Sequence, residues 1–232
     1  MSIEQDVSAS IVTPRDAASI VVIRDRLTAP SVLMGQRSQS SSFMPSRFVF
    51  PGGSVDATDS AVRLSGDLNP ICSARLAQHD GAPELTSALV AAAIRELWEE
   101  TGQILGRRGA WSGAVPKGWE GFASAGFVPS AAAVSYVFRA ITPITMHKRF
   151  DARFFLVDAE ELGSDPDDFS RADAELSHLQ WIPLERARDF SLPRITEQVL
   201  DDIAVILGHD MKVPEVRFFY NAPGVSEFRT IL

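Results

Sequence analysis

The sequence is poor in cysteine, since Cys72 is the only one among 232 residues. A single cysteine excludes an internal disulfide and a cysteine-rich zinc site. No apolar run approaches the roughly 20 residues that a membrane-spanning helix needs. Positive charge is also scarce: 22 Lys and Arg face 30 Asp and Glu, which gives a net charge of −8. This balance argues against a nucleic acid or an anionic membrane as a partner held by bulk electrostatics.

The N-terminal segment, residues 1–13, lacks the pattern of a signal peptide. It carries Glu4 and Asp6 and has no apolar stretch behind a basic start. Together with the single cysteine, this predicts a protein of the reducing cytoplasm. The apolar fraction of 45% and the charged fraction of 22% are ordinary for a globular chain. We expect one fairly large domain over residues 1–232, and the sequence leaves a homodimer open.

Apolar periodicity predicts a mixture of strands and helices. Strands are expected at 17–24, 31–37, 48–50, 132–142, 150–157, 177–182 and 216–220, and helices at 71–78, 84–101, 183–188 and 195–207. The segment 111–129 has no clear period and is expected to be a structured loop or a short helix. Because strands and helices do not alternate regularly, we expect an α/β fold with a mixed β-sheet and helices packed on its faces.

The most informative stretch is an acidic helix end. Glu96, Glu99 and Glu100 stand at positions i, i+3 and i+4 of the helix expected at 84–101, behind Arg95 and ahead of Gly102. Residues three and four apart share a helix face, so the three carboxylates should converge. Taken alone, such a cluster is more often a solvated acidic face. An oxygen-rich cluster also suits Mg²⁺ or Mn²⁺, and the upstream sequence favours that interpretation.

Upstream, the strand expected at 48–50 ends in Pro51-Gly52-Gly53, a strong turn signal. This combination resembles the Nudix hydrolase family, whose box reads G-x5-E-x7-R-E-U-x-E-E-x-G-U, with U a bulky apolar residue. Residues 95–103 match every fixed position of the second half except the last, where Gln103 stands. The resemblance implies a Nudix-like α/β/α sandwich with a mixed β-sheet and inserted helical or loop segments.

The first glutamate of the box has no contiguous counterpart. Asp59 follows Gly53 by six positions but precedes Arg95 by 36, where the contiguous box needs roughly 8. Without an insertion Ser87 would stand there, and Glu84 is out of register. Insertions are therefore expected at about 60–84 and 107–130. Whether Asp59 or Glu84 replaces the first acid stays open.

The interruption and the flanking motifs resemble the Nudix subgroup that includes coenzyme A diphosphatases. The stretches that carry this likeness are 32–38, 43–45, 49–53, 150–155 and 175–183. The resemblance implies hydrolysis of a nucleoside diphosphate linked to another moiety, with coenzyme A or acyl-CoA among the substrates and a nucleotide-containing small molecule as the partner. ADP-ribose or NADH is the alternative, and a non-catalytic nucleotide sensor is a second class.

The resemblance also implies roles for individual residues. Metal ligands would be Glu96, Glu99, Glu100 and the Gly52 carbonyl, with Glu96 binding a second ion or acting as base. Arg95 would orient a carboxylate through bidentate hydrogen bonds, or simply form an i, i+4 pair on the helix surface. Other predicted site residues lie farther away: Glu175, or else Asp173, as an acid from a distant loop, and Arg37 and Arg153 as phosphate contacts.

Overall fold

The computed structural model describes residues 12–80 and 83–232. Residues 1–11 of the N-terminal segment and residues 81–82 of the expected 60–84 insertion lie outside the described residues. The strands are β1 (Arg15–Arg24), β2 (Ser31–Arg37), β3 (Phe48–Val49), β4 (Gly52–Ser54), β5 (Gly106–Arg108), β6 (Phe127–Pro129), β7 (Ser135–Ile141), β8 (Phe150–Asp158), β9 (Leu176–Pro183), β10 (Val216–Ala222) and β11 (Val225–Ile231). The helices are α1 (Pro70–Asp80), α2 (Pro83–Thr101), α3 (Glu120–Ser124) and α4 (Arg194–Gly208), with 3₁₀ turns η1 (Asp59–Ala61), η2 (Ala159–Glu161) and η3 (Leu184–Asp189).

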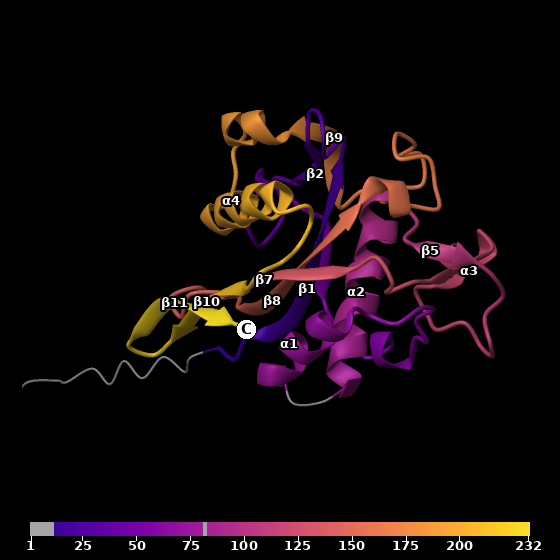
Figure 1. The fold of residues 1–232 in the computed structure, drawn as a ribbon, viewed down its shortest axis with the longest axis horizontal. Coiled ribbons are helices and arrows are strands. Elements are labelled where there is room, and N and C mark those ends of the chain that lie inside the picture. The colour runs from indigo at the N-terminus through magenta and orange to yellow at the C-terminus, as the bar shows by residue number, and fades with distance from the viewer. Residues whose placement is uncertain (1–11, 81–82) are drawn as a thin grey trace, which may run out of the picture.

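Within the described residues, nine strands form one sheet (Figure 1). Its order is β11-β10-β7-β8-β1-β2-β3, while β4 also pairs with β1 and β9 with β2. The pairs β1/β8 and β7/β10 are parallel, and β1/β2, β7/β8 and β10/β11 are antiparallel. The mixed β-sheet predicted from the sequence is therefore confirmed.

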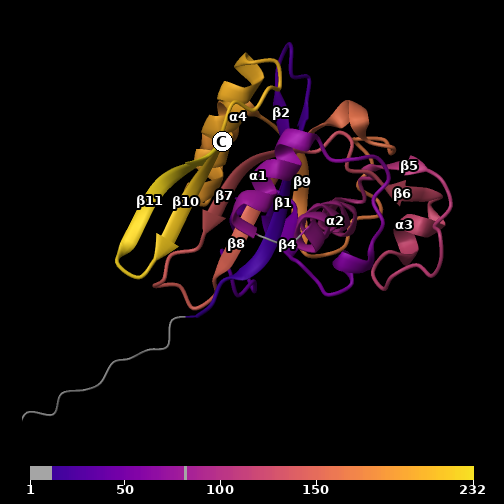
Figure 2. The same ribbon diagram turned by 60° about the horizontal axis from the view of Figure 1, so that its bottom comes forward.

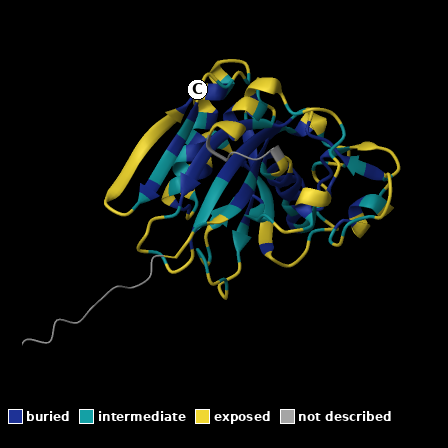
Figure 3. Ribbon diagram, turned by 90° about the horizontal axis from the view of Figure 1, so that it is seen from below, coloured by how far each residue is buried: buried dark blue, intermediate teal, exposed yellow. Residues whose placement is uncertain are grey.

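Helices cover both faces of this sheet because its central strands are apolar on both faces. In β1, Ile20 and Val22 enter a core shared with α1 and α2, whereas Val21 and Ile23 enter a core shared with α4. All four side chains are fully buried. Strands buried on both faces require a layer on each side. Figure 2 shows α1 and α2 over one part of the sheet and α4 over another, and Figure 3 shows the buried strands between them.

Three features differ from the sequence-based expectation. The turn signal after β3 does not end the sheet, because residues 52–54 form β4 against β1. The segment 111–129 contains a short helix, α3, which was one of the two expected alternatives, but also the unexpected strand β6, which pairs with β5 in a separate small sheet. A final strand, β11, follows β10 through a two-residue turn. None of the helices in residues 12–80 and 83–232 has the length and hydrophobicity needed to cross a membrane.

Candidate active site

Helix α2 presents its acidic end because its apolar side is fixed against the sheet. Leu89, Ala93 and Leu97 recur every four residues and are fully buried. The helix ends at Thr101, and Gly102 adopts a φ of +74° while donating its N–H to the Trp98 carbonyl at 2.8 Å. This left-handed residue is the usual helix stop and favours glycine. The three glutamates are thereby held on the side of α2 that faces β4.

Arg95 is the centre of the cluster, with only 5% of its surface exposed. Its Nε and Nη2 donate to both carboxylate oxygens of Asp59, at 2.9 and 3.1 Å. Its Nη1 donates to Glu96 and Glu99, each at 2.8 Å, and Nη2 also reaches the Ser54 carbonyl at 3.0 Å. The simple surface pair with Glu99 is therefore one part of a buried network. The Ser54 group is a backbone carbonyl, which every residue has, so the sequence could not identify this contact to Arg95.

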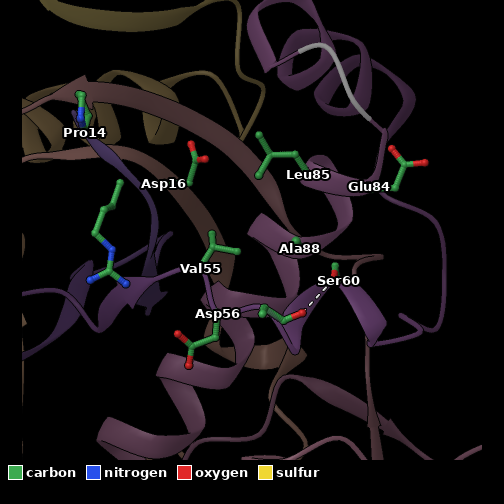
Figure 4. A pocket seen from close by; sticks show the side chains of 10 residues that line it. Pro14, Asp16, Val55, Asp56, Ser60, Glu84, Leu85 and Ala88 are labelled. Atoms are coloured by element: carbon green, nitrogen blue, oxygen red, sulfur yellow. Dashed lines mark hydrogen bonds between the residues drawn. The ribbon is translucent and has the colours of Figure 1, made fainter.

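Among the residues weighed for the first acid, Asp59 is the one that meets Arg95. Asp59 is fully buried on η1, and its Oδ2 also accepts the Asp56 N–H at 2.8 Å. Glu84 and Ser87 are exposed near the start of α2. Glu84 borders a separate open hollow of about 430 Å³, shown in Figure 4, that is also lined by Asp16, Asp56, Val55, Leu85 and Ala88.

Glycines 52 and 53 allow the backbone of β4 to approach the acids. The Gly52 N–H donates to Glu100 Oε2 at 2.8 Å. A Cβ on Gly53 would lie 2.3 Å from Glu96 Oε1, and one on Gly52 would lie 2.3 Å from Ser19 Oγ. Side chains at either position would collide, so glycine is required for this close packing. Glu100 Oε1 is buried and has no hydrogen-bond partner.

The three helix carboxyls have raised pKa values because they are buried together. Burial, followed in importance by the charge of Glu96, raises the pKa of Glu100 well above its ordinary range. Burial raises the pKa of Glu96 to about 7, although Arg95 acts to lower it. The pKa of Glu99 is also raised by burial, against Arg95. Burial acts to lower the pKa of Arg95, but hydrogen bonds to Asp59 and the surrounding carboxylates raise it overall. Such perturbed groups are typical of functional sites.

The distant acids predicted from the sequence lie beside this cluster. The charge of Glu175 raises the pKa of both Glu96 and Glu100, and the charge of Asp173 raises that of Glu99. Asp173 also donates its backbone N–H to the Glu99 carbonyl at 2.8 Å. Glu175 is exposed and accepts a hydrogen bond at 3.0 Å from Arg37, which projects from the end of β2.

Arg153 lies elsewhere in the structure. Its guanidinium is 1% exposed on β8, with Nη1 2.6 Å from the Asp16 carboxylate and 2.7 Å from the Asp151 carbonyl. Burial within the sheet does not favour the predicted phosphate contact.

Trp119 and Phe122 are fully buried and pack edge to face. They belong to the buried apolar core on the α1 and α2 side of the sheet.

Carboxylates on this cluster suit a hard divalent cation. In the part of the chain that the structure describes, no three Asp, Glu, His or Cys side chains are grouped so that they could hold a metal ion as they stand. Arg95 donates a hydrogen bond to one carboxylate oxygen of Glu96 and to one of Glu99. The unpartnered, buried Oε1 of Glu100 nevertheless fits a cation, since a buried carboxylate oxygen normally has a partner.

No protein-family model and no curated protein sequence matches this chain. Among solved structures, a NUDIX hydrolase from Alicyclobacillus acidocaldarius is similar over 86% of this chain and 97% of its own, with 28% identity and a TM-score of 0.63. A C. elegans Ap4A hydrolase is less similar, with 16% identity and a TM-score of 0.47 over 84% of this chain and 98% of its own. The NUDIX domain of Shewanella oneidensis NrtR complexed with ADP ribose has 14% identity and a TM-score of 0.48 over 88% of this chain and 94% of its own. The first of these likenesses confirms the sandwich fold expected from the sequence.

Proposed function

We propose that this chain, a Nudix-type hydrolase, cleaves the diphosphate bond of a nucleotide joined to a second moiety, with Mg²⁺ or Mn²⁺ as cofactor. The observation that carries the proposal is the convergence of five carboxyls on one site, three of which bind Arg95. Glu96, Glu99 and Glu100 come from α2, Asp59 from η1, and Glu175 from the segment before β9. A structural role alone does not explain why three glutamates with raised pKa values are packed together.

Glu96, Glu99 and Glu100 would hold the metal, together with the Gly52 carbonyl that the family resemblance implies. Bound there, a divalent ion neutralises charge on the phosphoryl oxygens and activates a water molecule. The glycine pair on β4 brings backbone within contact distance of the same carboxylates. The Gly52 carbonyl would add a backbone oxygen to the three carboxylates, and such oxygen ligands suit Mg²⁺.

The protein's own groups position the reaction. Arg95 fixes the carboxylates of Glu96 and Glu99 while Asp59 fixes Arg95. Glu96, with a pKa of about 7, can accept a proton from an attacking water near neutral pH. Arg37, which pairs with the exposed Glu175, would contact a substrate phosphate. We leave Arg153 out of this assignment because its guanidinium is buried and paired.

For the substrate we propose coenzyme A or an acyl-CoA, with ADP-ribose or NADH as the alternative. The support is the sequence likeness around 32–53 and 150–183, and insertions at about 60–84 and 107–130 are part of the same proposal. The test is incubation of the purified chain with Mg²⁺ and coenzyme A, ADP-ribose, NADH or dinucleoside polyphosphates, with products identified by mass. Release of 3′,5′-ADP and a phosphopantetheine would support coenzyme A, and no turnover of any member would overturn the enzymatic assignment.

One observation favours a second candidate, a nucleotide sensor without catalysis. Two of the helix carboxylates are engaged by Arg95 and are not arranged around a cation. Calorimetric titration with the same nucleotides distinguishes the two functions. Tight nucleotide binding without metal-stimulated turnover would establish the sensor, whereas turnover that requires Mg²⁺ would exclude it.

A further inference from the structure

The outer edge of β11 differs from the opposite edge of the sheet. Strand β9 pairs with β2 through an irregular register between Met34 and Gln36, contains His178 at a φ of +51°, and ends in Pro183. Bulges and proline are devices that prevent an edge strand from pairing with another chain. Strand β11 has none of them: its seven residues pair with β10 in unbroken register. Among the described residues, no strand pairs with its other side.

Strand β11 is also unusually exposed. Six of its seven residues are exposed, and it forms a continuous exposed band at the margin of the molecule (Figure 3). Val225 and Phe228 are 37% and 47% exposed, and the following Leu232 is 76% exposed. An exposed, regular edge with apolar side chains is a template for further strand pairing.

The hairpin geometry determines which backbone groups face the open edge. Hydrogen-bonded and non-hydrogen-bonded pairs alternate along an antiparallel ladder. Ala222 and Val225 flank the two-residue turn, so they form a hydrogen-bonded pair, and Glu227 and Arg229 follow at alternate positions. These residues direct N–H and C=O toward β10. Ser226, Phe228 and Thr230 therefore direct theirs outward.

This alternation restricts how two copies of β11 can pair. In an antiparallel pair, two opposed residues either both direct their backbone groups toward the partner strand or both direct them away. In a pair with two-fold symmetry, this condition is met only when the axis passes through one residue position, so that this residue faces the same residue of the other copy. Centring on Glu227 would oppose two glutamates, and centring on Arg229 would oppose two arginines. Centring on Phe228 instead places Glu227 opposite the partner copy's Arg229, and Arg229 opposite its Glu227. The same register places Val225 opposite Ile231 and Ser226 opposite Thr230.

We propose that β11 is the surface through which two copies of this chain associate, paired antiparallel about Phe228. Glu227 and Arg229 already form an ion pair within the strand, at 2.7 Å, on the face where Arg229 stacks on Tyr220. Association would convert this pair into a cluster of four alternating charges across the two-fold axis. On the other face Phe228, which stacks on Phe219, would meet its counterpart and cover exposed apolar surface.

Sedimentation velocity of the full chain over a range of concentrations tests the proposal. We expect a monomer–dimer equilibrium. The single variants Glu227→Arg and Arg229→Glu each place like charges opposite one another, and each should raise the dimer dissociation constant by about tenfold or more. Mixing the two single variants restores opposite charges across the interface, as does the double variant, so both should recover wild-type association. Glu161→Arg, a charge reversal on exposed η2, is the matched control and should change nothing.

Three results would overturn the proposal: a monomer at every concentration, single variants that dimerise like the wild type, or a mixture that associates no better than its components. Circular dichroism of each variant verifies folding, and recovery by mixing cannot be explained by misfolding. Deletion of residues 1–11 supplies a further outcome. Unchanged association would support pairing through β11, and its loss would show that the N-terminal segment forms the contact instead.

Discussion

Replacing Glu96 with Gln should make the protein more stable at alkaline pH while it removes activity. The pKa of Glu96 is raised from 4.5 to about 7 by burial, so the folded state holds this proton more tightly than the unfolded state. The charged carboxylate therefore costs folding free energy as pH rises above 4.5, and the cost is complete above pH 7. At about 1.4 kcal/mol for each pH unit, the difference is about 3 kcal/mol.

Glutamine keeps the shape and an acceptor oxygen for Arg95 but carries no charge. The free energy of unfolding of Glu96→Gln, measured by urea denaturation, should exceed that of the wild type by about 3 kcal/mol at pH 8. The two proteins should converge near pH 4.5. Glu161→Gln, on the exposed surface of η2, is the matched control and should shift stability by less than about 0.5 kcal/mol at any pH. A Glu96→Gln variant less stable than the wild type at pH 8 would show that the charged Glu96 carboxylate does not destabilise the folded state.

The remaining predictions concern the same cluster. Glu100→Gln should lower turnover by roughly 10³-fold in steady-state assays with an unchanged circular dichroism spectrum, and wild-type turnover would disprove its role. Gly53→Ala should lower turnover at least about tenfold, because the new Cβ would lie 2.3 Å from the Glu96 carboxylate; Gly208→Ala, with open space around its Cβ, should leave turnover unchanged. Asp59→Ala should lower the free energy of unfolding by about 3 kcal/mol, because it leaves a buried arginine without its bidentate partner, and a loss below about 1 kcal/mol would contradict that pairing.

The sequence predicted the elements that have strong apolar periodicity. Helix α2 was expected at 84–101 and spans Pro83–Thr101, because Leu89, Ala93 and Leu97 form its buried line and Gly102 ends it. Strand β11 was missed because its exposed residues have no alternating apolar pattern. Strand β4 was missed because its two glycines are a turn signal locally, whereas close packing against Ser19 and Glu96 is the reason for them here.

The sequence predicted the part of the candidate site that lies on helix α2, but it did not determine which acid outside the helix joins it. Three glutamates three and four residues apart converge in any helix, so their grouping follows from sequence spacing. The choice between Asp59 and Glu84 does not, because it depends on how residues 54–84 return to α2. The structure brings Asp59 against Arg95 across 36 positions and leaves Glu84 exposed. The burial that raises the carboxyl pKa values is likewise a property of the packed fold.

The most direct test of the metal assignment is calorimetric titration of Mn²⁺ into the wild-type protein and into the Glu100→Gln variant. Glu100 is the most buried of the three helix glutamates and has a buried oxygen without a partner, so we expect the wild type to bind Mn²⁺ and the variant to bind it at least about tenfold more weakly. Equal Mn²⁺ affinity in the two proteins, or no binding by the wild type, would contradict the account.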